Sequence, residues 1–361
     1  SLPSRGLGDV YKRQVDYVGA GTVEFLLAPT GEFFFLEMNT RIQVEHPVTE
    51  LVTGIDIVRE QLRIANGEPM SCDSLMMRGH AIEVRLYAED AANGFLPSIG
   101  PLAVFRPPEG PGIRLDTGVR EGDDVTPNYD PMLAKLIVWA PSRPEALEKM
   151  RRALEEFVVL GTTTNIEFLR DLCDAEPVVS GTTTTTTIDE LWPNGWNPPA
   201  DSLLEDAALL VAAGAETLGL HRTRATVSAH SEAGPISPFS TLQRRYPLMR
   251  HTFASPDGPV EVTLERNGEA FTLEGQTLVQ HNRGRLHLTL RDGRTCLAHA
   301  AKVGDVWWVH LNGRTYKWER IEPGSAGTEH EGGLVAPMPG KVLEVLVREG
   351  EEVESLSLIH I

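Results

Sequence analysis

The chain has 361 residues, of which 41% are hydrophobic and 23% are charged, and its formal net charge is −18. This length is enough for two or three domains with separate cores, and no apolar run is long enough to span a membrane. The acidic balance argues against a nucleic-acid partner, because binding a phosphate backbone needs clustered lysine and arginine. We therefore expect neither nucleic acid nor membrane as a partner. The three cysteines match no zinc or redox spacing, which predicts a reducing compartment.

The first predicted element is a β-hairpin. Val23–Leu27 and Phe33–Leu36 are rich in β-branched and aromatic residues, and Pro29-Thr30-Gly31 supplies a turn between them. One amphipathic helix is expected next, with Thr49 as its N-cap and Gly67 at its C-terminal end. Its apolar residues recur at helical spacing: Leu51, Ile55, Val58, Leu62 and Ala65.

An α+β region continues to about Leu191. Alternation predicts a strand over 80–87, an apolar run predicts a strand over 134–139, and a helix is expected from about Arg143 to Val158. Residues 192–201 are dense in Pro, Gly and Asn, which is typical of a linker.

The region after this linker changes character. A helix is predicted over 202–213, followed by short alternating strands. Regular hairpin signals indicate a small antiparallel barrel or sandwich. The signals are Asn267-Gly268, Arg283-Gly284, Asp292-Gly293 and Asn312-Gly313.

The most informative stretch runs from Glu37 to Pro47. Its odd positions carry polar groups, namely Glu37, Asn39, Arg41, Gln43 and Glu45. In an extended chain alternate residues share a face, so we expect these side chains to form a row, which Glu24 on the partner strand can join. Mg²⁺ is usually held by one or two carboxylates together with substrate phosphates, and arginine binds planar oxyanions through paired hydrogen bonds. Spacing alone leaves a second reading open, in which the row is a solvated face of an edge strand.

Two motifs in this region resemble the ATP-grasp core of biotin carboxylases. They span Gly19 to Leu26 and Glu37 to Glu50, and the Arg-x-Gln-Val-Glu-His run is the specific part. Carbamoyl phosphate synthetase, a close relative of that family, has a different continuation. The similarity extends from about Val15 to Leu191 through four further stretches: His80 to Arg85, Phe95 to Ser98, Tyr129 to Lys135 and Thr163 to Leu169.

The resemblance implies roles position by position. Glu24 and Glu37, supported by Asn39, are similar to ligands of Mg²⁺ (or Mn²⁺) on ATP. Arg41, Gln43 and the backbone of Val44 resemble the bicarbonate pocket, and Glu45 resembles the base that deprotonates bicarbonate. Leu26 and Ile188 match positions that flank adenine, and Arg114 resembles the arginine that stabilises the biotin enolate.

These roles imply a ligase of two stages, with ATP, Mg²⁺ and biotin as cofactors. Bicarbonate attacks the γ-phosphate to give carboxyphosphate, which yields CO₂ and phosphate. Phosphate then removes the N1 proton of biotin, and the biotin anion captures CO₂.

The C-terminal segment narrows the family. Ala336 to Val342 resembles the opening of a biotin-carrier domain, although a lipoyl domain begins similarly. The insert Asp201–Glu322 looks like the spacer of propionyl- and methylcrotonyl-type carboxylase α subunits, which docks on the carboxyltransferase β subunit. The expected partners are that subunit, bicarbonate and the biotinyl carrier domain. The acyl group is left open, because acyl specificity lies on the β subunit.

The resemblance stops abruptly before Val15 and after about Glu354, so both tails look non-native. The family's Gly-rich lid and biotin-bearing lysine lie outside the sequence, and Lys341 stands at the wrong place in the motif to replace that lysine. We expect this chain alone to be inactive. The full-length enzyme is expected to be oligomeric and cytoplasmic, or in the mitochondrial matrix if eukaryotic.

The expected fold class is α+β: the C-terminal part of a biotin carboxylase fold, then a helix with an antiparallel β-barrel, then the start of a biotinyl barrel-sandwich domain. Two other functions remain as alternatives, a non-catalytic docking or carrier remnant and a non-biotin ATP-grasp ligase. The predicted segments are a tail (1–14), ATP-grasp core (15–79), biotin carboxylase C-terminal domain (80–191), linker (192–200), spacer (201–323), second linker (324–333), truncated biotinyl domain (334–354) and second tail (355–361).

Overall fold

The computed structural model describes residues 16–28, 30–72, 74–220, 248–255, 258–268, 270–281 and 285–321. Its chain divides into two compact units. The first comprises Ser1–Val84, Glu109–Asp116 and Lys135–Arg151, and the second comprises Arg85–Pro108, Thr117–Ala134 and Arg152–Ile361. Four predicted segments lie outside the described residues: both tails, the second linker and the biotinyl segment with Lys341.

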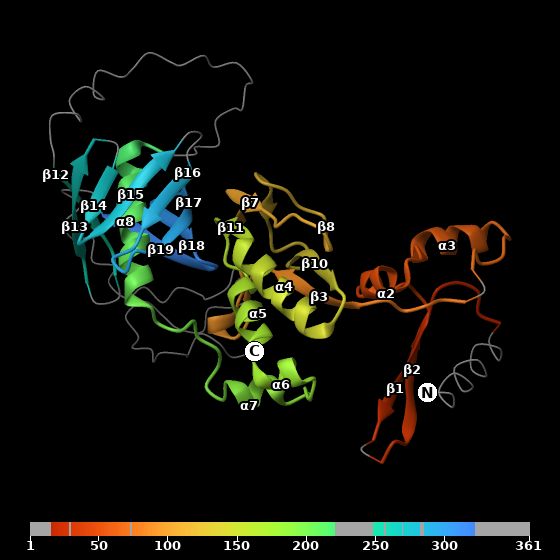
Figure 1. The fold of residues 1–361 in the computed structure, drawn as a ribbon. Coiled ribbons are helices and arrows are strands. Elements are labelled where there is room, and N and C mark those ends of the chain that lie inside the picture. Colours follow the sequence, from red (N-terminus) through yellow and green to blue (C-terminus); the bar gives the residue numbers. More distant parts are fainter. Residues whose placement is uncertain are drawn as a thin grey trace, which may run out of the picture. The chain divides into compact units, whose positions relative to one another are not determined.

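The first unit begins with the predicted hairpin, which is confirmed. Strands β1 (Thr22–Leu27) and β2 (Phe33–Asn39) pair antiparallel, with a register shift between Glu24 and Phe25 (Figure 1). The turn is closed by the Gly31 amide, which donates to the Ala28 carbonyl at 2.9 Å. Pro29, which the turn prediction included, lies outside the described residues.

The single helix expected after the hairpin is wrong, because the structure has two. Helix α2 (His46–Thr53) ends at Gly54, whose φ of 78° is a left-handed conformation that glycine adopts without steric cost. Helix α3 (Ile57–Ala65) starts anew at Asp56, whose carboxylate accepts from the Arg59 amide at 2.8 Å. The apolar spacing continues across the break, so periodicity alone concealed it.

Three strands form a sheet in the order β3-β10-β8, and they confirm the predicted strands over 80–87 and 134–139. Leu136, Ile137 and Val138 are fully buried in its central strand. Helix α4 (Arg143–Glu156) follows, two residues shorter than expected, since Val158 begins strand β11 instead. The strands of the sheet are β3 (His80–Tyr87), β10 (Met132–Ala140) and β8 (Ile113–Thr117).

The second unit contains short paired strands and helices around residues 85–200. Three two-stranded sheets pair β4 with β5, β6 with β9 and β7 with β11. Residues 192–200 form neither helix nor strand, although Trp196 is buried against Phe168 at a ring distance of 5.9 Å. The bounds are β4 (Glu89–Asp90), η1 (Ala91–Asn93), β5 (Leu96–Pro97), β6 (Gly100–Pro101), β7 (Val104–Arg106), β9 (Asp124–Val125), β11 (Val158–Leu160), α5 (Ile166–Cys173), α6 (Glu176–Ser180) and α7 (Thr187–Leu191).

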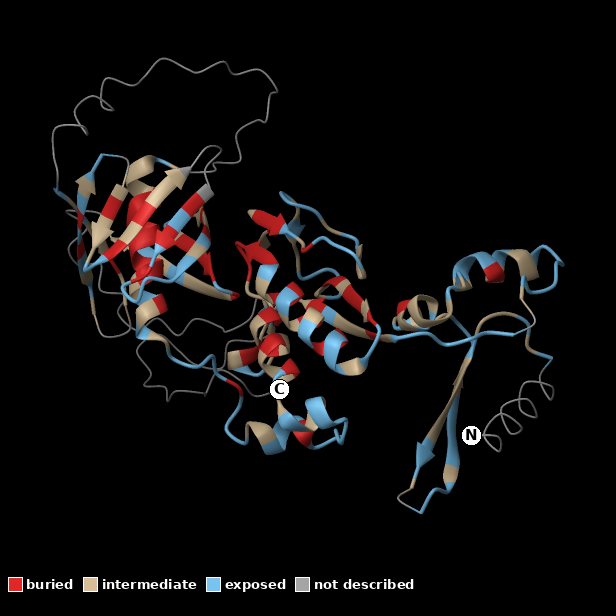
Figure 2. Ribbon diagram, in the orientation of Figure 1, coloured by how far each residue is buried: buried red, intermediate tan, exposed pale blue. Residues whose placement is uncertain are grey.

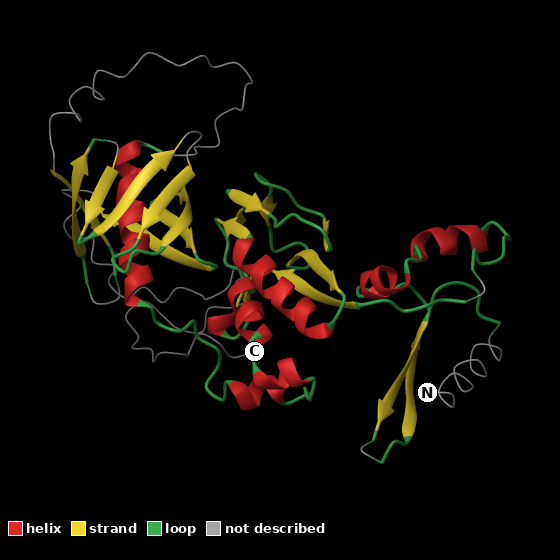
Figure 3. Cartoon of the chain, in the orientation of Figure 1, coloured by secondary structure: helices red, strands yellow, loops and turns green. Residues whose placement is uncertain are grey.

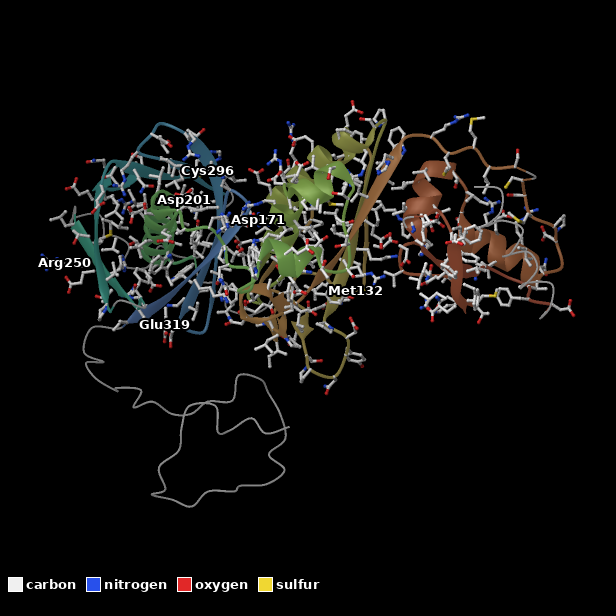
Figure 4. The ribbon with its side chains drawn as sticks, turned by 90° about the horizontal axis from the view of Figure 1, so that it is seen from below. Met132, Asp171, Asp201, Arg250, Cys296 and Glu319 are labelled. Carbon is white, nitrogen blue, oxygen red and sulfur yellow. The ribbon has the colours of Figure 1, made fainter. Side chains whose placement is uncertain are left out.

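The rest of the second unit is a closed eight-stranded antiparallel barrel with helix α8 (Ser202–Leu218) running through it (Figures 1 and 3). The middle of the helix, residues 207–215, is apolar on all sides, and Figure 2 shows it buried inside the strands. Asp201, labelled in Figure 4, caps its first turn by accepting from the Leu203 and Leu204 amides. Gly214 allows close packing, because a Cβ there would collide with Leu278.

The barrel confirms one of the two architectures expected from the hairpin signals. Strand β12 closes the ring on β19 through Thr252 and Phe253. Turns at 267–268, 292–293 and 312–313 join neighbouring strands as predicted, whereas Gly284 lies outside the described residues. The strands are β12 (Leu248–Phe253), β13 (Val260–Asn267), β14 (Ala270–Leu273), β15 (Gln276–His281), β16 (Arg285–Thr289), β17 (Thr295–Val303), β18 (Val306–Leu311) and β19 (Arg314–Ile321).

Helix α5 holds the 312–313 turn of the barrel within the same unit. The buried Arg170 donates to the carbonyls of Asn312 at 3.1 Å and Gly313 at 2.9 Å. Asp171, labelled in Figure 4, accepts from Arg170 at 3.2 Å. Among the described residues, no helix has the length and apolar character needed to cross a membrane.

Candidate active site

The hairpin of the first unit places two carboxylates side by side. Glu24 and Glu37 are direct partners in the register of β1 and β2. The Asn39 amide nitrogen donates to Glu24 Oε1 at 2.8 Å and to Glu37 Oε1 at 3.0 Å. Gln43 donates to the same Glu24 oxygen at 2.8 Å. The Asn39 amide therefore bridges two acidic groups that would otherwise repel each other, and the Gln43 amide further orients Glu24.

This donor set fits Mg²⁺. The metal prefers one or two carboxylates and completes its octahedron with waters and substrate phosphates, so a larger protein cage is not needed. Among the described residues, no group of three or more His, Cys, Asp or Glu is placed so that it could hold a metal ion. Rotation of the Asn39 amide would present its oxygen to a cation.

The expected row of polar side chains from Glu37 to Glu45 is wrong beyond Asn39, where β2 ends. The chain then turns into α2: the His46 amide donates to the Gln43 carbonyl at 3.3 Å, and Pro47 occupies the first turn of the helix. Proline suits this position because the first helical amides lack intrahelical acceptors. Gln43 still reaches Glu24, but through a loop and not along a strand.

Arg41 and Glu45 lie in that loop. Both side chains are exposed, and Arg41 donates to the neighbouring Ile42 carbonyl at 3.2 Å. Glu45 occupies the N-cap position of α2 without a side-chain capping bond. The predicted anion-binding arginine and the predicted base are thus accessible to a ligand from the same five-residue turn.

Arg114 on β8 is held from two sides. It donates through Nε and Nη2 to the two oxygens of Asp116, at 2.8 and 2.9 Å. Its Nη1 donates to Glu50 Oε2 at 2.7 Å, while Glu50 Oε1 accepts from the Ile57 amide at the start of α3. These three bonds use three of the five guanidinium N–H groups, so two remain for a ligand.

The hydrogen bonds with Asp116 raise the pKa of Arg114, which therefore stays positively charged. Partial burial tends to raise the pKa of Asp116, but the bonds and charges of Arg114 and Lys135 outweigh it and lower that pKa. Both groups are ionised at neutral pH. The arginine lines an open hollow of about 470 Å³ together with His46, Glu50 and Asp56.

Lys135 is a member of this region that the sequence prediction missed. Its Nζ donates to the Val44 carbonyl at 2.9 Å and lies 3.4 Å from Asp116 Oδ2. The available signal was a single charge inside the apolar strand β10, whose neighbours Ala134 and Leu136 are buried. Glu50 and Lys135 itself lie within the recognised stretches but received no role, and Asp116 lies two positions after Arg114.

The two predicted adenine neighbours are not brought together within one unit. Leu26 lies on β1 in the first unit and is 58% exposed. Ile188 lies on α7 in the second unit and is 43% exposed. Their roles remain predictions, as do those of the other site residues.

Comparison with known families identifies two regions of the chain. Residues 83–190 match the biotin carboxylase C-terminal domain. Residues 10–72 match the ATP-binding domain of the carbamoyl-phosphate synthase L chain. The second match covers the hairpin with Glu24 and Glu37 and the loop with Arg41 and Glu45, and the first covers Arg114.

Similar proteins include acyl-CoA carboxylase subunits. The propionyl-CoA carboxylase alpha chain of Ruegeria pomeroyi is 35% identical over 384 residues, covering 95% of this chain and 55% of the relative. The mitochondrial methylcrotonoyl-CoA carboxylase subunit alpha of Rattus norvegicus is 35% identical over 379 residues, covering 97% and 52%. The chain thus spans about half the length of these relatives.

A solved structure of Rhizobium etli pyruvate carboxylase is also similar, with a TM-score of 0.51 and 33% identity. The similarity covers 63% of this chain and 25% of that one. Together with the family matches and the acyl-CoA carboxylase relatives, it shows that residues 83–190 are a biotin carboxylase C-terminal domain and that the chain as a whole is similar to acyl-CoA carboxylase alpha subunits.

Proposed function

We propose that the chain takes part in the ATP- and bicarbonate-dependent carboxylation of biotin, as the biotin carboxylase part of an acyl-CoA carboxylase. The observation that carries this proposal is the pairing of Glu24 with Glu37 through Asn39, with Gln43 also bonded to Glu24, in the same unit as Arg114. A solvated edge strand would not need two amides to organise two opposed carboxylates. A site for a cation and its phosphate ligand does need them.

Glu24 and Glu37 would bind Mg²⁺ on ATP, with Asn39 holding their geometry. When bound, the metal neutralises phosphate charge and helps to align the γ-phosphate. Leu26 and Ile188 would contact adenine. The role of the protein at this end of the site is to fix oxygen ligands in place before the nucleotide arrives, which lowers the cost of ordering them.

Bicarbonate would bind at the turn between β2 and α2. Arg41 and Gln43 supply N–H donors, and the Val44 backbone completes the pocket. Glu45 accepts the bicarbonate proton as a bicarbonate oxygen attacks the γ-phosphate, forming one P–O bond while the bond to ADP breaks. The resulting carboxyphosphate yields CO₂ and phosphate.

Arg114 would stabilise the biotin anion. Phosphate takes the N1 proton, negative charge develops on the ureido oxygen, and N1 then bonds to CO₂. The two N–H groups of Arg114 that are not used by Asp116 or Glu50 can donate to this oxygen. Because the cluster of Arg114 with its carboxylates is already formed, little reorganisation is needed when the charge appears.

The remaining parts of the proposal concern partners. The α8 barrel would dock on a carboxyltransferase β subunit, which sets the acyl group, and a biotinyl carrier domain would deliver biotin to Arg114. The assembly would act in the cytoplasm, or in the mitochondrial matrix of a eukaryote. These assignments are supported by similarity to propionyl-CoA and methylcrotonoyl-CoA carboxylase alpha subunits.

The proposal is tested by ADP release from the complete protein that carries this chain. We expect release to require bicarbonate and to accelerate with added biotin. Glu45→Gln should abolish the acceleration, while Glu32→Gln, an exposed carboxylate bonded to Thr30 on the same hairpin, should not. ADP release that ignores both bicarbonate and biotin would overturn the proposal.

A further inference from the structure

A lysine outside the predicted site connects its two halves. Lys135 lies on β10, 91 positions along the chain from Val44, and its side chain is 13% exposed. Lysine is seldom buried without partners, because the ammonium loses its hydration. Here two partners replace the water: the Val44 carbonyl at 2.9 Å and Asp116 Oδ2 at 3.4 Å.

Each partner belongs to a different half of the site. Val44 lies between Gln43 and Glu45 in the loop proposed to bind and deprotonate bicarbonate. Asp116 binds the guanidinium of Arg114 through both carboxylate oxygens. The Oδ2 atom that faces Lys135 also accepts from Arg114 Nη2 at 2.9 Å, so one oxygen serves both cations.

The far side of Arg114 is equally fixed. Glu50, near the end of α2, accepts from Nη1 at 2.7 Å, and its other oxygen accepts from the Ile57 amide. Two cations, Lys135 and Arg114, thus alternate with two carboxylates in a connected chain that begins at the Val44 carbonyl and ends at α3. The formal charges of these four side chains cancel, so removing one of them would leave an uncompensated charge in a partly buried setting.

We propose that Lys135 is a positioning residue that couples the bicarbonate loop to Arg114, so that the two halves of the site keep one relative geometry. This inference rests on the proposed function for its catalytic meaning. The coupling itself is a property of the fold. Lys135 touches neither reacting group; it acts on the Val44 carbonyl and on Asp116.

The first test measures the coupling without any activity. Hydrogen–deuterium exchange of residues 41–45 and 113–117 is measured in the whole chain. The Lys135→Met and Lys135→Arg variants are compared with the unmodified protein. Loss of a charge-assisted bond should speed exchange on the order of tenfold in both segments of Lys135→Met. Lys135→Arg should recover part of the protection, because the arginine keeps the charge.

Lys149→Met is the matched control. Lys149 also donates to two backbone carbonyls, those of Pro111 at 3.1 Å and Trp139 at 2.8 Å, but reaches neither Val44 nor Asp116. The Lys149→Met variant should leave the exchange rate of residues 41–45 unchanged. Faster exchange in only one segment of Lys135→Met, or equal loosening of 41–45 in Lys149→Met, would refute the coupling.

The second test uses the complete protein. Lys135→Met should raise KM for bicarbonate and lower biotin-dependent kcat, leave KM for ATP unchanged, and be partly rescued by Lys135→Arg. Unchanged bicarbonate KM and kcat would show that the coupling has no catalytic role. If the unmodified protein shows no biotin-dependent turnover, the proposed function fails, and the exchange experiment still decides whether Lys135 couples the segments.

Discussion

Glu24 and Glu37 face each other across the β1–β2 hairpin, and one amide, that of Asn39, donates to both. Two carboxylates that face each other across a strand pair repel. Replacing one of them should therefore not lower the stability of the fold, unless the pair has a purely structural role. We expect Glu37→Gln to leave the unfolding temperature unchanged or slightly raised. Its affinity for Mn²⁺, used as a paramagnetic probe in place of Mg²⁺, should fall roughly tenfold to a hundredfold.

Titration of Mn²⁺ by electron paramagnetic resonance, with the nucleotide present, measures this affinity. Glu32→Gln is the control, because Glu32 is an exposed carboxylate of the same hairpin whose side chain accepts a hydrogen bond from Thr30. Equal Mn²⁺ affinity in Glu37→Gln and the unmodified protein would remove Glu37 from the metal site.

Arg114→Lys should separate charge from geometry. Lysine keeps the positive charge but cannot make the paired bonds to Asp116 while also reaching Glu50. We expect biotin-dependent turnover of the complete protein to fall about a hundredfold, as for other lost oxyanion donors. ADP release without biotin should change much less, since Arg114 acts in the second stage.

Arg120→Lys is the matched control, because Arg120 is an exposed arginine of the second unit that pairs with Asp123. A parallel loss of both activities in Arg114→Lys would instead indicate a general structural role for the arginine.

Arg170→Met tests the attachment of α5 to the barrel. The substitution leaves the carbonyls of Asn312 and Gly313 without their buried donor and leaves Asp171 short of one partner. We expect the free energy of unfolding of the second unit to fall by about 3 kcal/mol. Urea denaturation followed by tryptophan fluorescence measures it. Arg294→Met, which removes an exposed ion pair with Asp292 in the same unit, should cost less than about 1 kcal/mol.

His310 gives the barrel a dependence on pH. It is 6% exposed, and neither ring nitrogen has a hydrogen-bond partner among the described residues. Burial lowers its pKa from 6.5 to about 3, so the unfolded chain binds a proton that the folded chain excludes. The contribution of neutral His310 to the free energy of unfolding is therefore complete above pH 6.5. It is lost as the pH falls from 6.5 toward the folded pKa of about 3.

Between about pH 7 and about pH 5 this loss should be on the order of 2 kcal/mol. His310→Leu removes the titrating group and the unpaired ring nitrogens, so its unfolding free energy should vary less with pH and exceed that of the parent at the lower pH. Chemical denaturation at both pH values measures the difference. Identical pH dependence in the two proteins would contradict the exclusion of the proton by the fold.

Local patterns predicted the elements whose causes are local. The β1–β2 hairpin follows from β-branched and aromatic runs around a turn. The Asn312-Gly313 dipeptide marked a barrel turn because both of its residues favour the left-handed backbone conformation that they adopt, with φ of 49° and 73°. Helix α8 was predicted too short, since its apolar character extends through Ala215 and its cap is Gly219.

Features that depend on competing or distant contacts were not predicted. Alternation continued past Asn39, but the start of α2 at Pro47 ended the strand, and Gly54 divided a helix whose apolar spacing appeared continuous. The partners of Lys135 lie 91 and 19 positions away, a separation no local pattern encodes. Arg114 was singled out through family resemblance, whereas the residues that orient it emerged only from the fold.

The most direct test of the account is transfer of isotopically labelled bicarbonate to biotin by the complete protein. The labelled product is detected by mass spectrometry with and without ATP, in the unmodified protein and in Glu45→Gln. The account predicts ATP-dependent labelling of biotin that Glu45→Gln abolishes. Bicarbonate-dependent ATP hydrolysis with no label on biotin would contradict it and would favour a ligase that carboxylates or activates a different acceptor.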